Sequence, residues 1–180
     1  HLESIREAGA WKPSWTAIPN FIDVRRFHPG RSDALREELG VPIDALVVVC
    51  VAAIKRSHKR IDALIDEFGR LRDSRPDLPA YLVVAGGREP ETDELIQIGK
   101  SRLGDRVRFL VGFDRNRMAD LDRMGDVFVL ASLREMMPIA LVEATATGLP
   151  CVVNRHPILE WMVGPGGLAV DFTEPGAMAK

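Results

Sequence analysis

Short runs of apolar residues recur along the chain, and most of them lack the apolar–polar alternation of a strand with one exposed face. They are rich in valine, which is typical of strands that are buried on both faces of a parallel sheet. Six segments have this character: 45–53, 80–86, 106–112, 126–132, 150–154 and 167–171. We therefore expect each of them to form a strand of the core.

Between these runs, apolar residues recur at the three- and four-residue spacing of helices with one buried face. The clearest stretch runs from Ile61 to Leu71, a shorter one from Met118 to Met124 and a weaker one from Glu91 to Leu103. Strands that alternate with helices in this way predict a parallel sheet with helices on both faces. The predicted fold class is therefore α/β, with a Rossmann-like parallel sheet of six strands.

A further helical stretch is apolar on almost every side but carries a single carboxylate. It runs from Pro138 to Thr147 and holds Glu143 among alanine, leucine, isoleucine and valine residues. A helix that is apolar all round is usually buried, and a buried carboxylate without a partner is costly. Glu143 is therefore expected to meet either a cation of the core or a ligand.

Composition narrows the class of protein. The chain has 180 residues, 46% of them hydrophobic and 28% charged, which is ordinary for one globular domain with a proper core. A net charge of -2 gives no signature of nucleic-acid binding. No apolar run approaches the roughly 20 residues that cross a bilayer. Cys50 and Cys151 lie in apolar runs and are expected to be reduced core residues, which indicates a cytoplasmic protein.

The two ends of the chain indicate a piece of a longer protein. The chain begins with His1, and a new helix is expected to start after Pro175. Residues 18–30, here called the lead-in segment, are punctuated by prolines and are expected to be extended. We expect residues 1–17 to belong to a preceding domain or a linker, and residues 18–180 to form the domain.

The loops that follow the strands are the candidate ligand sites, because open parallel sheets bind ligands outside the carboxyl ends of their strands. The loop after the first strand carries the cations Lys55, Arg56, Lys59 and Arg60. Basic residues at the start of a helix oppose its macrodipole, so such a cluster favours an anion nearby, and phosphate is a common one. A solvated helix start is the alternative, and we favour a phosphate site.

Two carboxylates and two glycines complete the candidate site. Gly86 and Gly87 allow a close approach of the backbone or a turn with positive φ, but they match no dinucleotide-binding or Walker motif. Glu135 precedes Glu143 with seven residues between them, and Pro138 suits the first turn of a helix whose free amides attract phosphate or sugar oxygens. Each acid alone is explained as well by an ion pair or by solvation. Beside the basic loop, the pair fits hydroxyl groups while the cations fit a diphosphate.

Three segments together resemble the donor half of retaining glycosyltransferases with two Rossmann domains, the family often called group 1 or family four. The stretch IPNFIDVRRFHPG is similar to that family's Ile-Pro-Asn-Gly-Val-Asp segment and the Arg-Phe that follows it. The stretch EMMPIALVEATATGLPCVV matches its two glutamates, its following Ala and its Gly-x-Pro-Val-Val, and NRHPILE fits the next turn. The resemblance covers nearly the whole chain from Ile18 and implies one half of a GT-B fold.

The resemblance implies roles for the residues around the two glutamates. Glu143 would accept hydrogen bonds from the ribose hydroxyls of a nucleotide sugar, and Glu135 would be the catalytic residue that faces the transferred sugar. The amides of Met136, Met137 and Ile139 would contact sugar or phosphate oxygens. The glycine that usually follows the first glutamate is Met136 here, which would narrow the sugar pocket or mark an unusual donor.

The resemblance also implies which residues hold the nucleotide and its diphosphate. Lys59 takes the place of the family's diphosphate-binding lysine, and Arg56 or Lys55 that of its arginine. The loop is one residue longer than in the family, so the part that each cation takes stays open. Backbone near Gly86 and Gly112 would contact the base.

Partners follow from the same resemblance. An acceptor-binding half would precede this chain in its parent, so the fragment is expected to bind a nucleotide sugar but, unlike the full hexosyltransferase, to transfer little or no sugar. No metal or other cofactor is expected, because cations of the protein can neutralise the leaving diphosphate. No nucleic-acid partner is expected, and peripheral membrane association is an option for the parent only. A nucleotide-sugar epimerase half and a non-catalytic nucleotide-binding or interaction domain are the alternatives.

Overall fold

A parallel sheet of six strands forms the centre of the computed structural model, which describes residues 6–9 and 18–179. The strands are β1 (Leu46–Val51), β2 (Ala80–Gly86), β3 (Val107–Val111), β4 (Val127–Leu130), β5 (Cys151–Asn154) and β6 (Gly167–Val170). Their order across the sheet is β3-β2-β1-β4-β5-β6, and all the pairings are parallel. The predicted α/β class is confirmed, and all six predicted strands lie within two residues of their expected bounds.

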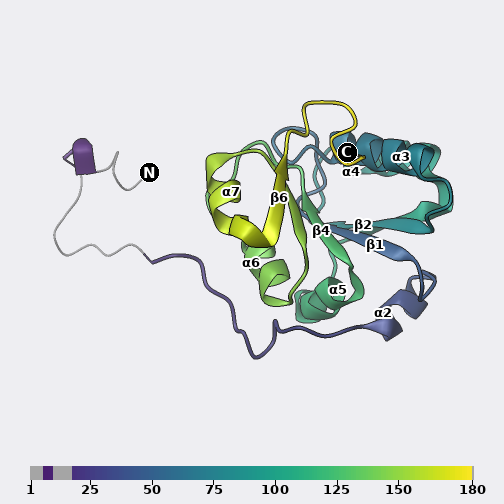
Figure 1. The fold of residues 1–180 in the computed structure, drawn as a ribbon, viewed down its shortest axis with the longest axis horizontal. Coiled ribbons are helices and arrows are strands. Elements are labelled where there is room, and N and C mark those ends of the chain that lie inside the picture. The colour runs from purple at the N-terminus through teal and green to yellow at the C-terminus, as the bar shows by residue number, and fades with distance from the viewer. Residues whose placement is uncertain (1–5, 10–17, 180) are drawn as a thin grey trace.

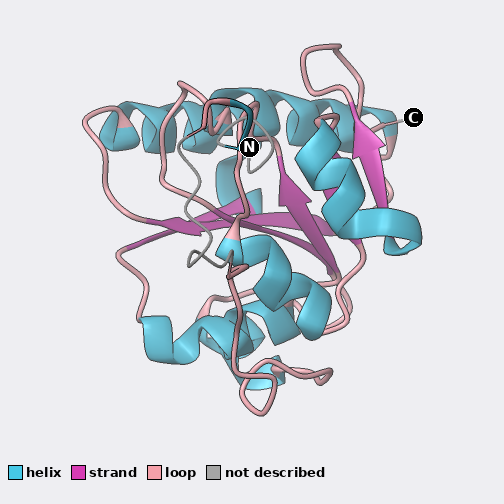
Figure 2. Ribbon diagram, turned by 90° about the vertical axis from the view of Figure 1, so that its left-hand side faces the viewer, coloured by secondary structure: helices cyan, strands magenta, loops and turns pink. Residues whose placement is uncertain are grey.

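Helices cover both faces of the sheet (Figures 1 and 2). They are α2 (Asp33–Glu38), α3 (Ile61–Ser74), α4 (Thr92–Leu103), α5 (Met118–Met124), α6 (Ile139–Ala146) and α7 (Pro157–Val163). Helices α3 and α4 pack on one face, and α2, α5, α6 and α7 pack on the other. Short 3-10 turns stand at Gly104–Arg106, Arg115–Arg117 and Gly164–Gly166.

The helical predictions are confirmed in part. The four stretches read from the sequence are α3, α4, α5 and α6, whereas α2 and α7 had not been predicted. The helix expected after Pro175 is wrong, because the described residues there form turns. Among the residues that the structure describes, no helix is long and apolar enough to cross a membrane.

The strands lack polar alternation because they are covered on both sides. Residues 47–50 of β1 and 80–85 of β2 are all buried. Cys50 and Cys151 are buried and free, as predicted for reduced core cysteines. The sheet therefore presents little but its strand ends to solvent, and the ends are where a ligand can reach it.

The lead-in segment is extended up to residue 23, as predicted, and then turns into the body of the domain. Phe27 is buried, and Leu35 and Val41 pack with β1, β2 and α5 in the core of one face. The residues that precede the sheet therefore fold together with it. The boundary predicted at residue 18 stays a prediction, because the residues before it fall outside the described ones.

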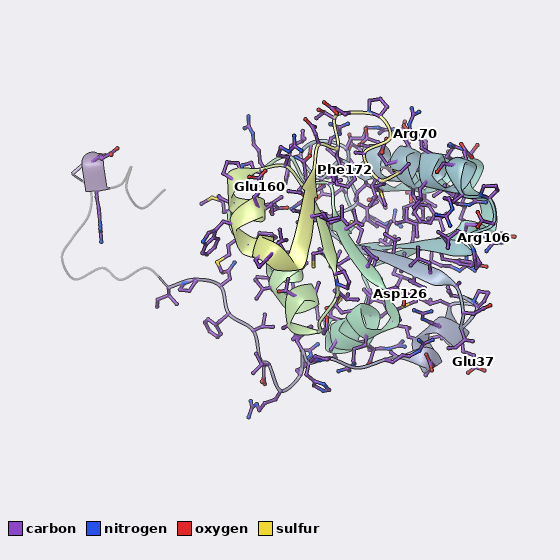
Figure 3. All side chains as sticks on the ribbon, viewed as in Figure 1. Glu37, Arg70, Arg106, Asp126, Glu160 and Phe172 are labelled. Atoms are coloured by element: carbon purple, nitrogen blue, oxygen red, sulfur yellow. The ribbon has the colours of Figure 1, made fainter. Side chains whose placement is uncertain are left out.

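A buried arginine ties α2 to the sheet. Arg36 is 2% exposed, and its guanidinium donates to the carbonyl oxygens of Met124 and Ala45 at 2.8 and 2.9 Å. It also pairs with the Asp126 carboxylate at 2.9 Å. Asp126, labelled in Figure 3, lies just before β4, at the amino edge of the sheet. A buried guanidinium is tolerated here because several of its donors have acceptors.

Candidate functional site

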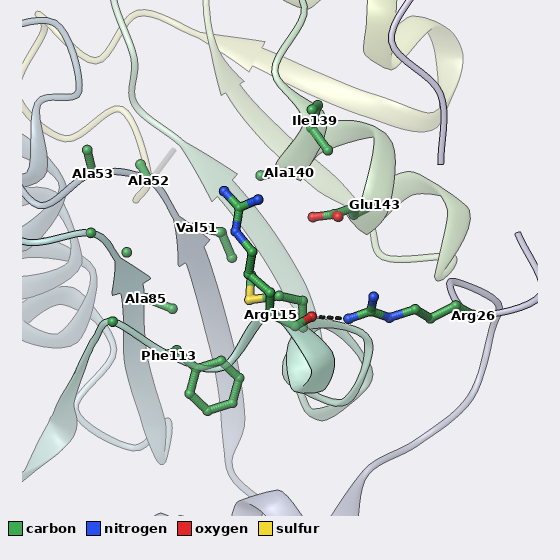
Figure 4. Close-up of a pocket in the computed structure, with 14 residues that line it drawn as sticks. Arg26, Val51, Ala52, Ala53, Ala85, Phe113, Arg115, Ile139, Ala140 and Glu143 are labelled. Carbon is green, nitrogen blue, oxygen red and sulfur yellow. Dashed lines mark hydrogen bonds between the residues drawn. The ribbon is translucent and has the colours of Figure 1, made fainter. Parts of the chain in front are cut away.

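A pocket of about 520 Å³ lies at the carboxyl edge of the sheet (Figure 4). Its walls come from the ends of β1 and β2, the loop after β3 and the first turns of α6. The strand order reverses between β1 and β4, and the pocket lies at this switch point. Open sheets bind their ligands at such a point, so the pocket is the candidate site.

Two of the predicted glycines bring the strand ends together in this pocket. A side-chain carbon at Gly86 would lie 1.7 Å from the carbonyl oxygen of Ala52, so only glycine fits between β1 and β2. Gly112 has φ +69, and its amide donates to the carbonyl of Gly86 at 2.9 Å. Both glycines line the pocket. Their packing role is thus evident, and their contact with a nucleotide stays a prediction.

Helix α6 borders the pocket rather than lying in the core on all sides. Leu141 and Ala144 are buried against β4 and β5, but Ile139 is 49% exposed. The expectation that this helix is buried all round is therefore wrong. Pro138 occupies the N-cap position, and the amides of Ile139 and Ala140 have no acceptor among the described residues. Free amides at a helix start favour an anion or a polar oxygen.

Glu143 lines the pocket from α6 and is partly buried. Within the described part of the chain, its carboxylate takes part in no hydrogen bond or ion pair. Burial raises its pKa above the ordinary value, against the opposing effect of the charges of Arg26 and Arg115. Of the two readings of this acid, the ion pair with a core cation is thus wrong. Its carboxylate faces a pocket with acceptor oxygens to spare.

Arg26 and Arg115 are pocket residues that had not been predicted. An Nη atom of Arg26 donates to the backbone carbonyl of Arg115, drawn as a dashed line in Figure 4. The Arg115 guanidinium extends into the pocket and has no carboxylate partner among the described residues. The position of Arg115 after β3 was a usable signal, because that loop lies at the carboxyl edge. Arg26 belongs to the Arg-Phe pair of the family resemblance, which gave it no role in a site.

The basic loop meets the first glutamate directly. Lys59 Nζ lies 2.5 Å from Glu135 Oε1, and the two side chains are only 18% and 11% exposed. The amide of Leu133 also donates to the carbonyl of His58 at 2.8 Å, which joins the loop after β1 to the loop after β4. Lys59 and Glu135 are thus brought together as expected, but as an ion pair and outside the lining of the pocket.

The other two predicted cations of the loop also have carboxylate partners. Lys55 lies 3.2 Å from Glu89, and Arg56 lies 2.7 Å from Glu94. The anions that this loop attracts are therefore, in part, carboxylates from the segment after β2. The binding of a diphosphate by these residues stays a prediction.

The lead-in segment reaches the loop that begins α6. The Asn20 side-chain amide donates to the carbonyl of Met137 at 2.6 Å. The side chain of Met136, the residue before Met137, is largely exposed. The contacts of the Met136, Met137 and Ile139 amides with a sugar stay predictions. Among the described residues, no group of three or more histidines, cysteines or acids is placed to hold a metal ion.

The parallel sheet with its helices on both faces matches the Rossmann-like fold of GT-B glycosyltransferases. Residues 45–180 match the family model described as "Glycosyl transferases group 1". The chain belongs to this family, as its resemblance predicted.

Known relatives agree with this assignment. The chain is 33% identical over 187 residues to D-inositol 3-phosphate glycosyltransferase 2 of Catenulispora acidiphila, covering 98% of this chain and 43% of that protein. Among solved structures, the sucrose-phosphate synthase of Thermosynechococcus elongatus superposes with a TM-score of 0.77 at 25% identity, covering 99% of this chain and 45% of that one. Anabaena Alr3699/HepE in complex with UDP-glucose gives 0.74 at 23% identity, covering 89% and 44%. The chain thus spans less than half the length of these proteins.

Proposed function

We propose that this chain is the donor-binding part of a retaining glycosyltransferase that moves a sugar from a nucleoside-diphosphate sugar to an acceptor. The observation that carries the proposal is Glu143, a partly buried carboxylate that lines the switch-point pocket and has no partner among the residues that the structure describes. The two hydroxyls of a ribose are donors at the right spacing for one carboxylate, and hydrogen bonds to a charged acceptor are strong. UDP-glucose in the related HepE structure is a ligand of this kind.

The remaining groups at this edge suit the rest of such a donor. The free amides of Ile139 and Ala140 fit phosphate oxygens, and Lys59, Lys55 and Arg56 are assigned to the diphosphate. Glu135 is assigned to the transferred sugar. When the bond between the sugar and the diphosphate breaks, negative charge grows on the leaving phosphate oxygen, and fixed cations and amides lower the energy of that state.

Binding of a panel of nucleotides tests the donor class. UDP, GDP and ADP, each with its nucleoside, are titrated into the 180-residue chain while the melting temperature is followed, because a ligand of the folded state stabilises it by mass action. We expect one diphosphate to bind far better than its nucleoside, and its affinity to fall with salt because the loop is cationic. Equal affinities for nucleoside and diphosphate would contradict a diphosphate site.

Glu143→Gln tests the ribose assignment. The substitution keeps the shape but removes the charge, so affinity for the diphosphate should fall by about one to two orders of magnitude, since hydrogen bonds to charged groups contribute roughly 1.5–3 kcal/mol. Fold stability should stay level or rise, because a poorly solvated charge is removed. The control is Glu160→Gln on α7, an exposed acid labelled in Figure 3, which should change neither. Lost stability with unchanged affinity would exclude ribose as the partner of Glu143.

A further inference from the structure

The lead-in segment is attached to both sides of the pocket. At one end, Asn20 donates to the carbonyl of Met137 at 2.6 Å, just before α6. At the other end, Arg26 donates to the carbonyl of Arg115, in the loop after β3. The next residue, Phe27, is buried and anchors the segment in the domain. Residues 20–26 therefore connect two walls of the pocket, and their course along the domain can be followed in Figure 1.

Arg26 lines the pocket with Glu143 but does not bond to it. An arginine that paired with the carboxylate in a fork would occupy the lone pairs that a ribose needs. Here the Arg26 guanidinium is held by a backbone carbonyl instead. Arg115 lines the pocket from the loop after β3 and forms no ion pair with any described residue. Both arginines can thus supply positive charge while Glu143 keeps its acceptor oxygens.

We propose that Arg26 is a positioning residue of the donor site, which together with Arg115 holds the Glu143 carboxylate charged and open to the ribose hydroxyls. The inference rests on the proposed function, in which Glu143 binds the ribose. Binding of the ribose removes the remaining water from a carboxylate that is already partly buried, and without nearby cations the acid would take up a proton instead. Through Arg26, the lead-in segment becomes part of the donor site.

Asp122, on α5, interacts electrostatically with Glu143 and has to be counted among its neighbours. Asp122 is 1% exposed, and both of its carboxyl oxygens lack hydrogen-bond partners among the described residues. Burial, together with the charge of Glu143, raises the pKa of Asp122 to about 8, and Arg123 opposes this shift. At neutral pH Asp122 is therefore largely protonated and adds little negative charge beside Glu143. The charged neighbours of Glu143 at that pH are then Arg26 and Arg115.

Removal of Arg26 has a matched control in Arg25, the residue that precedes it in the chain. Arg25 has the same charge, but its side chain is 89% exposed and pairs with Asp23 at 2.8 Å, away from the pocket lining. Affinities of Arg26→Gln and Arg25→Gln for UDP, GDP and ADP are measured between pH 5 and pH 8. Loss of the cation raises the pKa of Glu143 further, so the loss of affinity on acidification should begin roughly one pH unit higher in Arg26→Gln. Arg25→Gln should follow the unmodified chain.

The same substitution in a Glu143→Gln background separates an effect through Glu143 from a direct one. If Arg26 acts through the carboxylate, Arg26→Gln should change neither the affinity nor its pH dependence in that background. Arg26→Lys, which keeps the charge, should restore most of the normal pH profile. An equal loss of affinity with and without Glu143, or a pH profile identical to that of Arg25→Gln, would overturn the inference and leave the ribose assignment intact. Unchanged affinity of Glu143→Gln itself would instead contradict the proposed function.

Discussion

Asp122 is a buried carboxyl group whose two oxygens have no hydrogen-bond partner in the part of the chain that the structure describes. Its pKa is raised from 3.8 to about 8, so the folded state holds a proton that the unfolded state releases. The stabilising contribution is fully present below pH 3.8 and is lost as the pH rises through about 8. Asp122→Asn removes this titration, so the variant does not lose stability as the pH rises. The difference between the unfolding free energies of the variant and of the unmodified chain should therefore increase, in favour of the variant, by up to about 1.4 kcal/mol per pH unit across this range. Denaturant unfolding at several pH values measures the difference.

A neighbour on the same helix provides the control for this prediction. Asp120 pairs with Arg123 at 2.8 Å, and its side chain is 44% exposed, so solvent screens the pair. Asp120→Asn should lower stability only slightly and should not show the steady gain with rising pH expected of Asp122→Asn. A constant offset in Asp122→Asn as well would mean that the Asp122 carboxyl finds a partner in solution.

At Glu143, the residue taken alone left two partners open, a core cation or a ligand, and sequence reasoning favoured the ligand only because Glu135 and the basic loop were expected beside it. An apolar helix with one acid predicts that the acid has a partner, whether protein or ligand. The choice depended on where cations from distant parts of the chain lie, and Arg26 and Arg115 come from the lead-in segment and the loop after β3. Neither position carries a local pattern that tells a pocket arginine from a solvated one.

The loops after β1 and β4 are joined by one ion pair, and this pair restrains the cation that the proposed diphosphate site needs. Glu135→Gln leaves Lys59 largely buried without a counter-charge, so stability should fall by roughly 3–5 kcal/mol. The freed ammonium should bind phosphate better, and affinity for the diphosphate should rise by about fivefold, a gain of roughly 1 kcal/mol. Melting curves and nucleotide titrations of the same sample measure both.

Glu89→Gln is the matched variant, because it frees Lys55 in the same loop. Its ion pair is longer, 3.2 Å, and both side chains are more exposed than those of Lys59 and Glu135. Both effects should therefore be smaller. A Glu135→Gln protein that loses stability but gains no affinity would show that Lys59 does not contact the diphosphate.

The strands were easier to predict than the helices, for a physical reason. A strand buried on both faces needs an unbroken apolar run, and such runs are visible in a single sequence. Helix α2 has only six residues, and the side chains that it buries are Leu35 and the charged Arg36. The partners of Arg36 lie as much as 90 residues away in sequence, so its burial left no local mark. Helix α7 begins at Pro157, in a stretch that was read as a turn.

The chain as a whole covers 43% of the length of its inositol-phosphate glycosyltransferase relative. We expect it to bind a donor nucleotide but to transfer little or no sugar, because the rate gain from proximity needs donor and acceptor held together. The measurement is transfer of a labelled sugar from the nucleotide sugar that the binding panel selects. Robust transfer by residues 1–180 alone would contradict this expectation and would place an acceptor site within this chain.

Resemblance to the family supplied the two glutamates and Lys59, which local patterns alone left ambiguous. The fold then placed one of these residues, Glu143, in the pocket and paired the other two with each other. Motifs specify which residues meet at a strand edge, because the edge is set by topology. They do not specify which charges are already neutralised, because this depends on side chains from other loops.

The buried guanidinium of Arg36 determines where the crossover should lie in a chimera between this chain and a related protein. The family match begins at residue 45, yet Arg36 donates to Ala45 and Met124 and pairs with Asp126, all at or beyond that point. A chimera with its crossover at residue 45 would take these acceptors from this chain but α2 from the other parent protein. Asp126 would then face whatever side chain the other parent supplies at position 36. The crossover of such a chimera therefore belongs before Phe27, so that Arg36 and its acceptors all come from the same parent protein.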